Sequence, residues 1–149
     1  MFRKLCIVIL AATACSTALL AQNQPFLGIW QLNKEKTTNY PQQNQMIVNV
    51  PAVDGFTSLR VTIGTDGKSS SENHPVVFDG KPHATTGGDP REISYKLIDA
   101  NTIERTQNRA GKLSVDTEQV SSDGKTLTVK QATAVRVYDK QFNVEKLGR

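Results

Sequence analysis

The chain holds few side chains whose types and spacing could support metal binding. Its two histidines, His74 and His83, lie in or near segments rich in turn-forming residues. Neither belongs to a His-x-His or His-Glu-x-x-His motif, and no cysteine lies near them, so the ligand spacing that a metal site needs is missing. We therefore expect two solvated loop histidines and no metal site.

Serines and carboxylates do not form a catalytic motif either. The serines at 69–71 and 121–122 sit in turn segments, and none stands in a Gly-x-Ser-x-Gly context. Asp66, Asp79 and Asp123 are each followed by Gly-Lys, and turn formation alone explains them. Nothing in the sequence selects an acid–base pair, so we expect no catalytic residues, no cofactor and no enzymatic activity.

Trp30 is the one side chain whose type and position could mark either a packed core, which is the favoured interpretation, or the floor of a ligand cavity. It is the only tryptophan and lies within 26–33, FLGIWQLN. A tryptophan buries a large area and needs a partner for its indole N–H, so it fits a packed core or the floor of a cavity.

The elements that would position Trp30 are short strands separated by tight turns. Asp-Gly-Lys occurs three times, and Asp54 opens a fourth Asp-Gly step. Glycine and aspartate tolerate the positive φ angles that two-residue hairpin turns require. Between the turns lie segments rich in Val, Ile and Thr, which predict strands over 27–33, 45–52, 57–65, 74–78, 91–98, 102–109, 112–121, 125–132 and 134–142.

Alternation of apolar and polar residues predicts which face of a strand is buried. Three segments alternate clearly. In 125–132 the face expected to be buried carries Leu127 and Val129, and in 91–98 it carries Ile93, Tyr95 and Leu97. In 57–65 it carries Leu59, Val61 and Ile63, with Arg60 and Thr62 on the opposite face.

Eight or nine short strands joined by tight turns predict an all-β fold, a single antiparallel up-and-down barrel. A sheet of this length leaves two unpaired edges unless it closes on itself or folds into two layers. A β-sandwich is the alternative fold. Its longer connections would be 34–44 and 79–90, and both read as loops.

The N-terminus reads as an export signal over residues 1–21, followed by one domain over 22–149. Two cations precede an apolar run that ends in small residues, and the run is too short for a confident transmembrane helix. The expected location is secreted or periplasmic. The alternative is a lipid anchor on Cys15, in a segment that loosely resembles a lipoprotein box; cleavage after Ala21 would instead remove both Cys6 and Cys15.

The charge pattern excludes one class of partner. The formal net charge of the whole chain is +4 at pH 7, and within 22–149 the cations are spread singly. No basic run with interleaved aromatics occurs, so we expect no nucleic-acid partner. No later stretch is apolar enough to span a bilayer, and nothing in the sequence fixes an oligomeric state.

Gly28-Ile29-Trp30, preceded by Phe26 and Leu27, resembles the opening motif of lipocalins and their calycin relatives, including fatty-acid-binding proteins. Those proteins are antiparallel barrels that carry small apolar ligands. The wider pattern is similar to small secreted bacterial lipocalin-like proteins, through Phe-x-Gly-x-Trp-x-Leu-Asn, the Asp-Gly-Lys turns and a final Val-Tyr-Asp-Lys-Gln. Residues 34–44 are too short and too polar for the helix pair that follows the first strand of fatty-acid-binding proteins.

The resemblance implies roles for Trp30, Arg136 and Tyr138. In such barrels the tryptophan sits at the closed end under a basic residue of the last strand, here Arg136, and in fatty-acid-binding proteins an Arg and a Tyr two residues apart bind the ligand carboxylate. Alternation also allows Val135 and Val137 to face inward, which would turn Arg136 and Tyr138 to water. For Arg136, stacking on Trp30 or a solvent-facing position is favoured over binding a ligand carboxylate together with Tyr138, because a buried arginine without a partner is costly.

These features predict an exported, non-enzymatic barrel that binds a small hydrophobic or amphipathic ligand. Apolar faces would line the cavity, with Trp30 at its floor and Arg136 and Tyr138 as a polar handle. The alternative is a structural or interaction module of the cell envelope whose barrel is filled with side chains. The interior volume and the face that Arg136 occupies distinguish the two.

Overall fold

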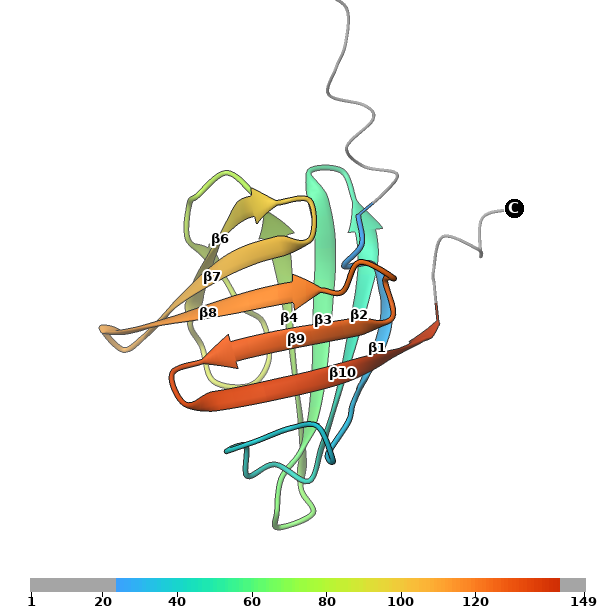
Figure 1. Cartoon of the computed structure of the whole chain (residues 1–149). Coiled ribbons are helices and arrows are strands. Elements are labelled where there is room, and N and C mark those ends of the chain that lie inside the picture. Colours follow the sequence, from blue (N-terminus) through green and yellow to red (C-terminus); the bar gives the residue numbers. More distant parts are fainter. Residues whose placement is uncertain (1–23, 143–149) are drawn as a thin grey trace, which may run out of the picture.

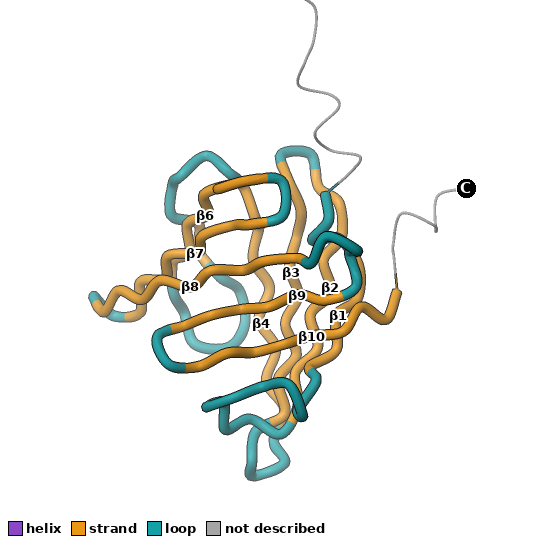
Figure 2. The backbone as a smooth tube through the Cα atoms, viewed as in Figure 1, coloured by secondary structure: helices purple, strands orange, loops and turns teal. Residues whose placement is uncertain are grey.

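The computed structural model describes residues 24–142, and within this range the chain forms antiparallel strands and no helix (Figures 1 and 2). The predicted export signal, its cleavage site and Cys15 lie outside the described residues. The strands are β1 (Gly28–Leu32), β2 (Asn44–Ala52), β3 (Gly55–Ile63), β4 (Ser69–Val77), β5 (His83–Ala84), β6 (Glu92–Asp99), β7 (Thr102–Arg109), β8 (Lys112–Val120), β9 (Thr126–Gln131) and β10 (Ala134–Phe142).

The strands form one ten-stranded meander that nearly closes into a barrel. Their order is β4-β3-β2-β1-β10-β9-β8-β7-β6-β5, so the first and last strands pair and every other neighbour is consecutive in the chain. In Figure 1, β7 to β10 cross in front of β2 to β4. The predicted up-and-down barrel is confirmed, with the two-residue β5 as an additional strand, and the order contains none of the crossovers of a Greek-key sandwich.

The barrel is least complete between β4 and β6. Asn73 of β4 and Thr86 exchange two backbone hydrogen bonds of 2.8 Å, which bridge this gap. The loop between β1 and β2, residues 33–43, contains no helix, as its polarity predicted. It is fixed to the start of β10, because Thr38 forms an antiparallel bridge with Val135.

The Asp-Gly-Lys triplets lie between strands as predicted, but they do not form two-residue hairpin turns: two lie in the longer β3–β4 and β8–β9 connections, and the third follows β4, which does not pair with β5. The glycines Gly67, Gly80 and Gly124 have φ values of 78°, 71° and 69°. In each triplet the lysine N–H donates to the aspartate Oδ1, over 2.9–3.1 Å. The assignment of the serines at 69–71 to a turn is wrong, because they open β4 and pair with the end of β3. Hairpin pairing here outweighs the turn preference of serine.

The interior of the barrel is apolar at one end and polar at the other. The apolar end is a packed core of Phe26, Leu27, Trp30, Leu32, Ile47, Phe56, Val76, Ile93, Tyr95, Ile103, Val120, Leu127, Val129 and Tyr138. Toward the other end the inward positions become polar: on β7, Ile103 is followed on the same face by Arg105 and Gln107.

The predicted buried face is right on β9, in part right on β6 and wrong on β3. Leu127 and Val129 are buried, and so are Ile93 and Tyr95. Leu97, by contrast, is 45% exposed, and the pairing of β6 with β7 shifts register directly after it.

On β3 the face opposite to the predicted one is buried. Leu59 is 37% exposed, whereas Arg60 is 4% exposed. Phe56 packs in the apolar core, where its ring stacks on that of Phe26 with centroids 6.2 Å apart. Period-two geometry then directs Ser58 and Arg60 inward with Phe56.

Candidate binding site: an arginine-lined cavity

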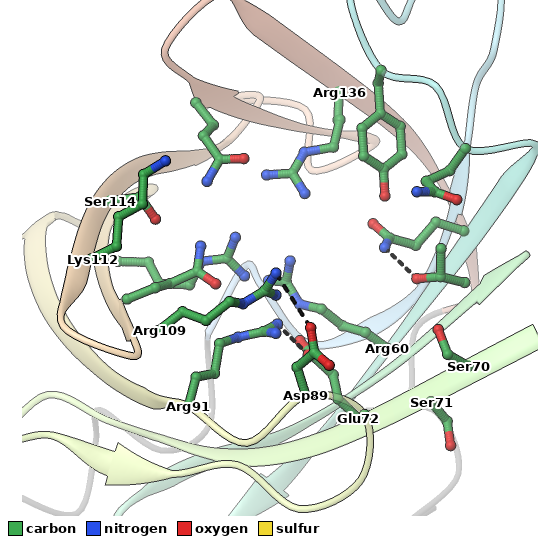
Figure 3. Close-up of a pocket in the computed structure, with 18 residues that line it drawn as sticks. Arg60, Ser70, Ser71, Glu72, Asp89, Arg91, Arg109, Lys112, Ser114 and Arg136 are labelled. Carbon is green, nitrogen blue, oxygen red and sulfur yellow. Dashed lines mark hydrogen bonds and ion pairs between the residues drawn. The ribbon is translucent and has the colours of Figure 1, made fainter. Parts of the chain in front are cut away.

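The polar end of the barrel holds a cavity of about 560 Å³ (Figure 3). Its lining comes from the 33–43 loop, from the loop before β6 and from strands on both sides of the barrel. Tyr40 is the only aromatic residue among the lining residues, and none of them is aliphatic. The prediction that apolar faces line the cavity is therefore wrong, because the apolar side chains fill the opposite end.

All five arginines of the described chain line this cavity, whereas only one of the nine lysines in that range does so. The guanidinium group is planar, always charged, and donates to carboxylates and phosphates in a bidentate manner, which the lysine ammonium does not. The five arginines are spread singly along the sequence, and the fold brings them together around this cavity. The lining cations are Arg60, Arg91, Arg105, Arg109, Arg136 and Lys112.

Three arginines and two carboxylates form a buried inner cluster, which comprises Arg60, Arg105, Arg136, Asp116 and Glu118. Arg60 Nη2 donates to Glu118 Oε1 at 2.6 Å, and Arg105 Nε lies 3.3 Å from the same oxygen. Arg105 also pairs with Asp116, and Arg136 Nη2 donates to Asp116 Oδ2 at 3.3 Å. No side chain of the cluster is more than 7% exposed. With three cations and two anions, the inner cluster has a net charge of +1.

Electrostatics keep Glu118 and Arg105 of this cluster ionised. Burial alone would raise the pKa of Glu118, but Arg60 and Arg105 outweigh burial and lower that pKa to about 2. Burial alone would lower the pKa of Arg105, but Glu118, followed by Tyr95 and Asp116, outweighs it and raises that pKa. The positive charges therefore persist at neutral pH.

A second group of charges, the rim cluster, comprises Arg91, Arg109, Lys112, Glu72 and Asp89. Arg91 pairs with Glu72, and their side chains are 10% and 12% exposed. Arg109 Nη1 lies 3.4 Å from Asp89 Oδ2, and both side chains are mostly exposed. Lys112 faces Arg109 across the β7–β8 pairing, and no carboxylate of the described chain forms an ion pair with it.

His74 is not a solvated loop residue. It lies on β4, is 2% exposed, and its ring stacks on that of Tyr95 with Nε2 2.7 Å from Tyr95 Oη. Burial, followed by the nearby arginines, lowers the pKa of His74 to about 3, so the imidazole is neutral at physiological pH. His83 lies on β5, 28% exposed at its side chain, with Nε2 3.1 Å from Asp79 Oδ1. Among residues 24–142 no group of three or more His, Cys, Asp and Glu is placed to hold a metal ion.

Trp30 lies in the apolar core, apart from the cavity. It is fully buried, its Nε1–H donates to the Phe26 carbonyl at 2.8 Å, and it is not one of the lining residues. The basic residue that packs on its ring is Lys140, whose Nζ lies 4.6 Å from the ring centroid. The predictions that Arg136 stacks on Trp30 and that Trp30 forms the cavity floor are both wrong.

Arg136 and Tyr138 both point into the barrel, so the solvent-facing alternative is wrong. They are 6% and 0% exposed, while Val135 is only partly buried. Arg136 lines the cavity, with Cζ 5.2 Å from the centroid of the Tyr40 ring. Tyr138 does not line it, but its hydroxyl donates to the side chain of Gln45, which does. Burial raises the pKa of Tyr138 to about 12, which keeps this hydroxyl protonated.

Sequence reasoning missed the other arginines of the cavity and the carboxylates that pair with them. One usable signal was present for Arg105 and Asp116. A hairpin turn at 110–111 sets the β7–β8 register, which places Arg105 directly opposite Asp116. The pair of Arg60 and Glu118 joins strands far apart in the sequence, and no local pattern predicts it.

No protein-family model matches the chain, and no curated protein matches it in sequence. Solved structures do share its fold. The fatty acid binding protein of Schistosoma mansoni in complex with arachidonic acid is 16% identical, with 80% of this chain and 98% of that chain covered and a TM-score of 0.56. A mutant of the fluorescent protein UnaG is 14% identical, with 78% and 96% covered and a TM-score of 0.53. At these identities the likeness shows the fold alone, an antiparallel β-barrel.

Proposed function

We propose that this protein binds a small amphipathic molecule through an anionic head group, inside the polar end of the barrel. The observation that carries the proposal is the convergence of all five described arginines on one cavity. Desolvating charges opposes folding, and well-packed apolar residues are often at least as stabilising as buried ion pairs. A buried cluster with more cations than anions is therefore better explained by an anion that it binds than by stability.

The inner cluster offers hydrogen-bond donors to such an anion. Within the described chain, Arg60 and Arg136 each donate to a carboxylate through Nη2 alone. Arg60 Nε, Arg105 Nη1 and Arg136 Nε are buried without an acceptor among the described residues. A carboxylate or phosphate would supply acceptor oxygens and offset the +1 charge of the cluster. Arg136 would then bind the anionic group directly, and Tyr138 would support the neighbouring Gln45 through its hydrogen bond. The resemblance to fatty-acid-binding proteins also implies a binding role for this Arg and Tyr.

The volume favours a ligand over a filled barrel. Small-molecule sites commonly enclose about 300–1,000 Å³, and this cavity falls within that range. A structural neighbour named as a fatty acid binding protein carries arachidonic acid, which supports a ligand within a barrel of this type. The polar lining here favours a shorter or more polar body than a long acyl chain.

The proposal includes export and a carrier role rather than catalysis, as in the small secreted lipocalin-like proteins that the sequence resembles. Export rests on the order of charged, apolar and small residues over 1–21, and the location would be the periplasm or the exterior of a bacterium. The carrier role is supported by the lining of the cavity, which includes neither of the two histidines of the described chain that could act as a general base.

Isothermal titration calorimetry with decanoate and the uncharged decanamide tests the proposal. We expect decanoate to bind about tenfold more tightly or better, because hydrogen bonds to charged groups contribute about 1.5–3 kcal/mol each. Arg136→Met should remove most of this preference. Lys130→Met, on an exposed position of β9, is the matched control and should retain it. Equal affinity for the two ligands, or unchanged decanoate binding by Arg136→Met, would refute the proposal.

A further inference from the structure

We propose that the ligand carries a second anionic group, which Lys112 and Arg109 hold at the rim of the cavity. This inference rests on the proposed function, because it assigns the other end of the same ligand. The class of ligand is therefore a small organic dianion rather than a simple fatty acid.

The charge balance of the two clusters carries the inference. The inner cluster has three cations and two carboxylates, and so does the rim cluster, where Arg91, Arg109 and Lys112 face Glu72 and Asp89. Each cluster therefore has one cation in excess. A ligand with one anionic group would neutralise one cluster and leave the other with its excess charge.

The rim cations are placed to meet a ligand that already contacts Arg136. In Figure 3, Arg136 projects into the open space from one side, and Arg109 and Lys112 border it elsewhere. The β7–β8 hairpin holds Arg109 and Lys112 opposite each other in register. The ion pair of Arg109 with Asp89 is 3.4 Å long, with side chains 57% and 71% exposed, so it is weak and easily exchanged for a ligand anion.

The electrostatic environment of Arg91 supports an excess of positive charge at this rim. Burial lowers the pKa of Arg91, and the charges of Arg105 and Arg109 lower it further, although Glu72 acts in the opposite direction. A ligand anion near these side chains would relieve that repulsion.

The space between the clusters is suited to a polar molecule. Its remaining lining includes the side chains of Gln45, Thr62, Ser70, Gln107, Ser114 and Gln131, and no aliphatic residue contributes to it. A long apolar tail would displace water from hydrogen-bonding groups there without apolar contacts in return. A ligand with two anionic groups would be held by the cations at both of its ends, so the spacer between these groups would not need apolar contacts.

Calorimetry with dicarboxylates and with monocarboxylates of matched chain length, from six to twelve carbons, tests the inference. We expect at least one dicarboxylate to bind about three- to tenfold more tightly than its monocarboxylate, as is reasonable for a partly exposed ion pair. Lys112→Gln should reduce this ratio to near one. Lys130→Gln changes an exposed lysine outside the cavity and should leave the ratio unchanged.

The outcomes separate this inference from the proposed function. If monocarboxylates bind but no dicarboxylate binds more tightly, the second anionic site is wrong and the proposed function stands. If a dicarboxylate binds more tightly but Lys112→Gln leaves the ratio intact, the assignment to Lys112 is wrong. If neither class binds, the proposed function fails and this inference fails with it.

Discussion

Glu118 is the residue on which the buried charges of the barrel most depend. Its carboxylate accepts from Arg60 at 2.6 Å and lies 3.3 Å from Arg105 Nε. It is 4% exposed, so the charge that it supplies to both guanidiniums is buried with them. Removing its charge would leave three buried arginines with Asp116 as the only carboxylate of the inner cluster.

Glu118→Gln should therefore reduce the free energy of unfolding by about 3–5 kcal/mol, the usual loss when one partner of a buried ion pair is removed. The folded pKa of Glu118 is about 2 and its ordinary value 4.5, so its contribution is complete above pH 4.5 and is lost as the pH falls toward 2. Urea unfolding of wild type and variant across this range measures both effects. Glu92→Gln, at an exposed position of β6, is the control. Equal stability of the two variants would show that the cluster does not need Glu118.

His74 gives a separate pH dependence at higher pH. Its folded pKa is about 3 against an ordinary 6.5, so protonation favours the unfolded chain. Stability should be constant above pH 6.5 and fall below it by up to about 1.4 kcal/mol per pH unit. His74→Gln should flatten the profile between pH 6.5 and 5, where Glu118 does not yet titrate. An unchanged slope in denaturant unfolding would mean that another group is responsible.

At the scale of elements, the closure of β1 against β10 depends on Gly28. This residue has φ 126°, and a Cβ added there would lie 2.4 Å from the Phe142 carbonyl oxygen. The glycine of the Gly-x-Trp motif is thus required by backbone geometry and by the close approach of the last strand.

Gly28→Ala should destabilise the protein by more than about 1 kcal/mol, because the new residue is incompatible with both φ and space. Gly124→Ala is the matched control, since Gly124 has φ 69° but no atom within 4 Å of its added Cβ. Chemical unfolding should show the larger loss for Gly28→Ala. Similar losses for the two variants would mean that close packing of β1 on β10 contributes little.

The elements were largely predictable from the sequence, because local chemistry specifies them. The Asp-Gly-Lys triplets fix turns through glycine φ and the aspartate side chain, and alternation on β9 identifies the buried face. The face of β3 was not predictable by the same rule. Alternation shows which residues share a face, and the rule that the apolar face is buried fails where the interior itself is charged.

The site was predictable only in part for the same reason. Arg136 and Tyr138 were identified as a pair on one face, but the sequence could not decide between water and interior. The buried position of Arg136 depends on Asp116, and that of Arg60 on Glu118, and in each pair the two strands are not neighbours in the sheet. Such pairings exist only after the barrel forms, so a local pattern assigns these arginines to the surface.

At the scale of the whole molecule, one end of the barrel holds the packed apolar core and the other end holds the cavity. The apolar end, with Trp30 and the stacked Phe26 and Phe56, supplies the packed core. The opposite end gathers the arginines around the cavity. Within residues 24–142 no helix is long and apolar enough to cross a membrane.

The central claim, that the arginine-lined end binds an anionic group, is tested most directly by locating a brominated carboxylate in crystals of the protein. Anomalous scattering from 10-bromodecanoate or a shorter homologue would place the ligand without ambiguity. We expect the carboxylate within hydrogen-bond distance of Arg136 and the bromine within the cavity or at its mouth. A carboxylate bound only outside the barrel, or seated at the apolar end beside Trp30, would contradict the account.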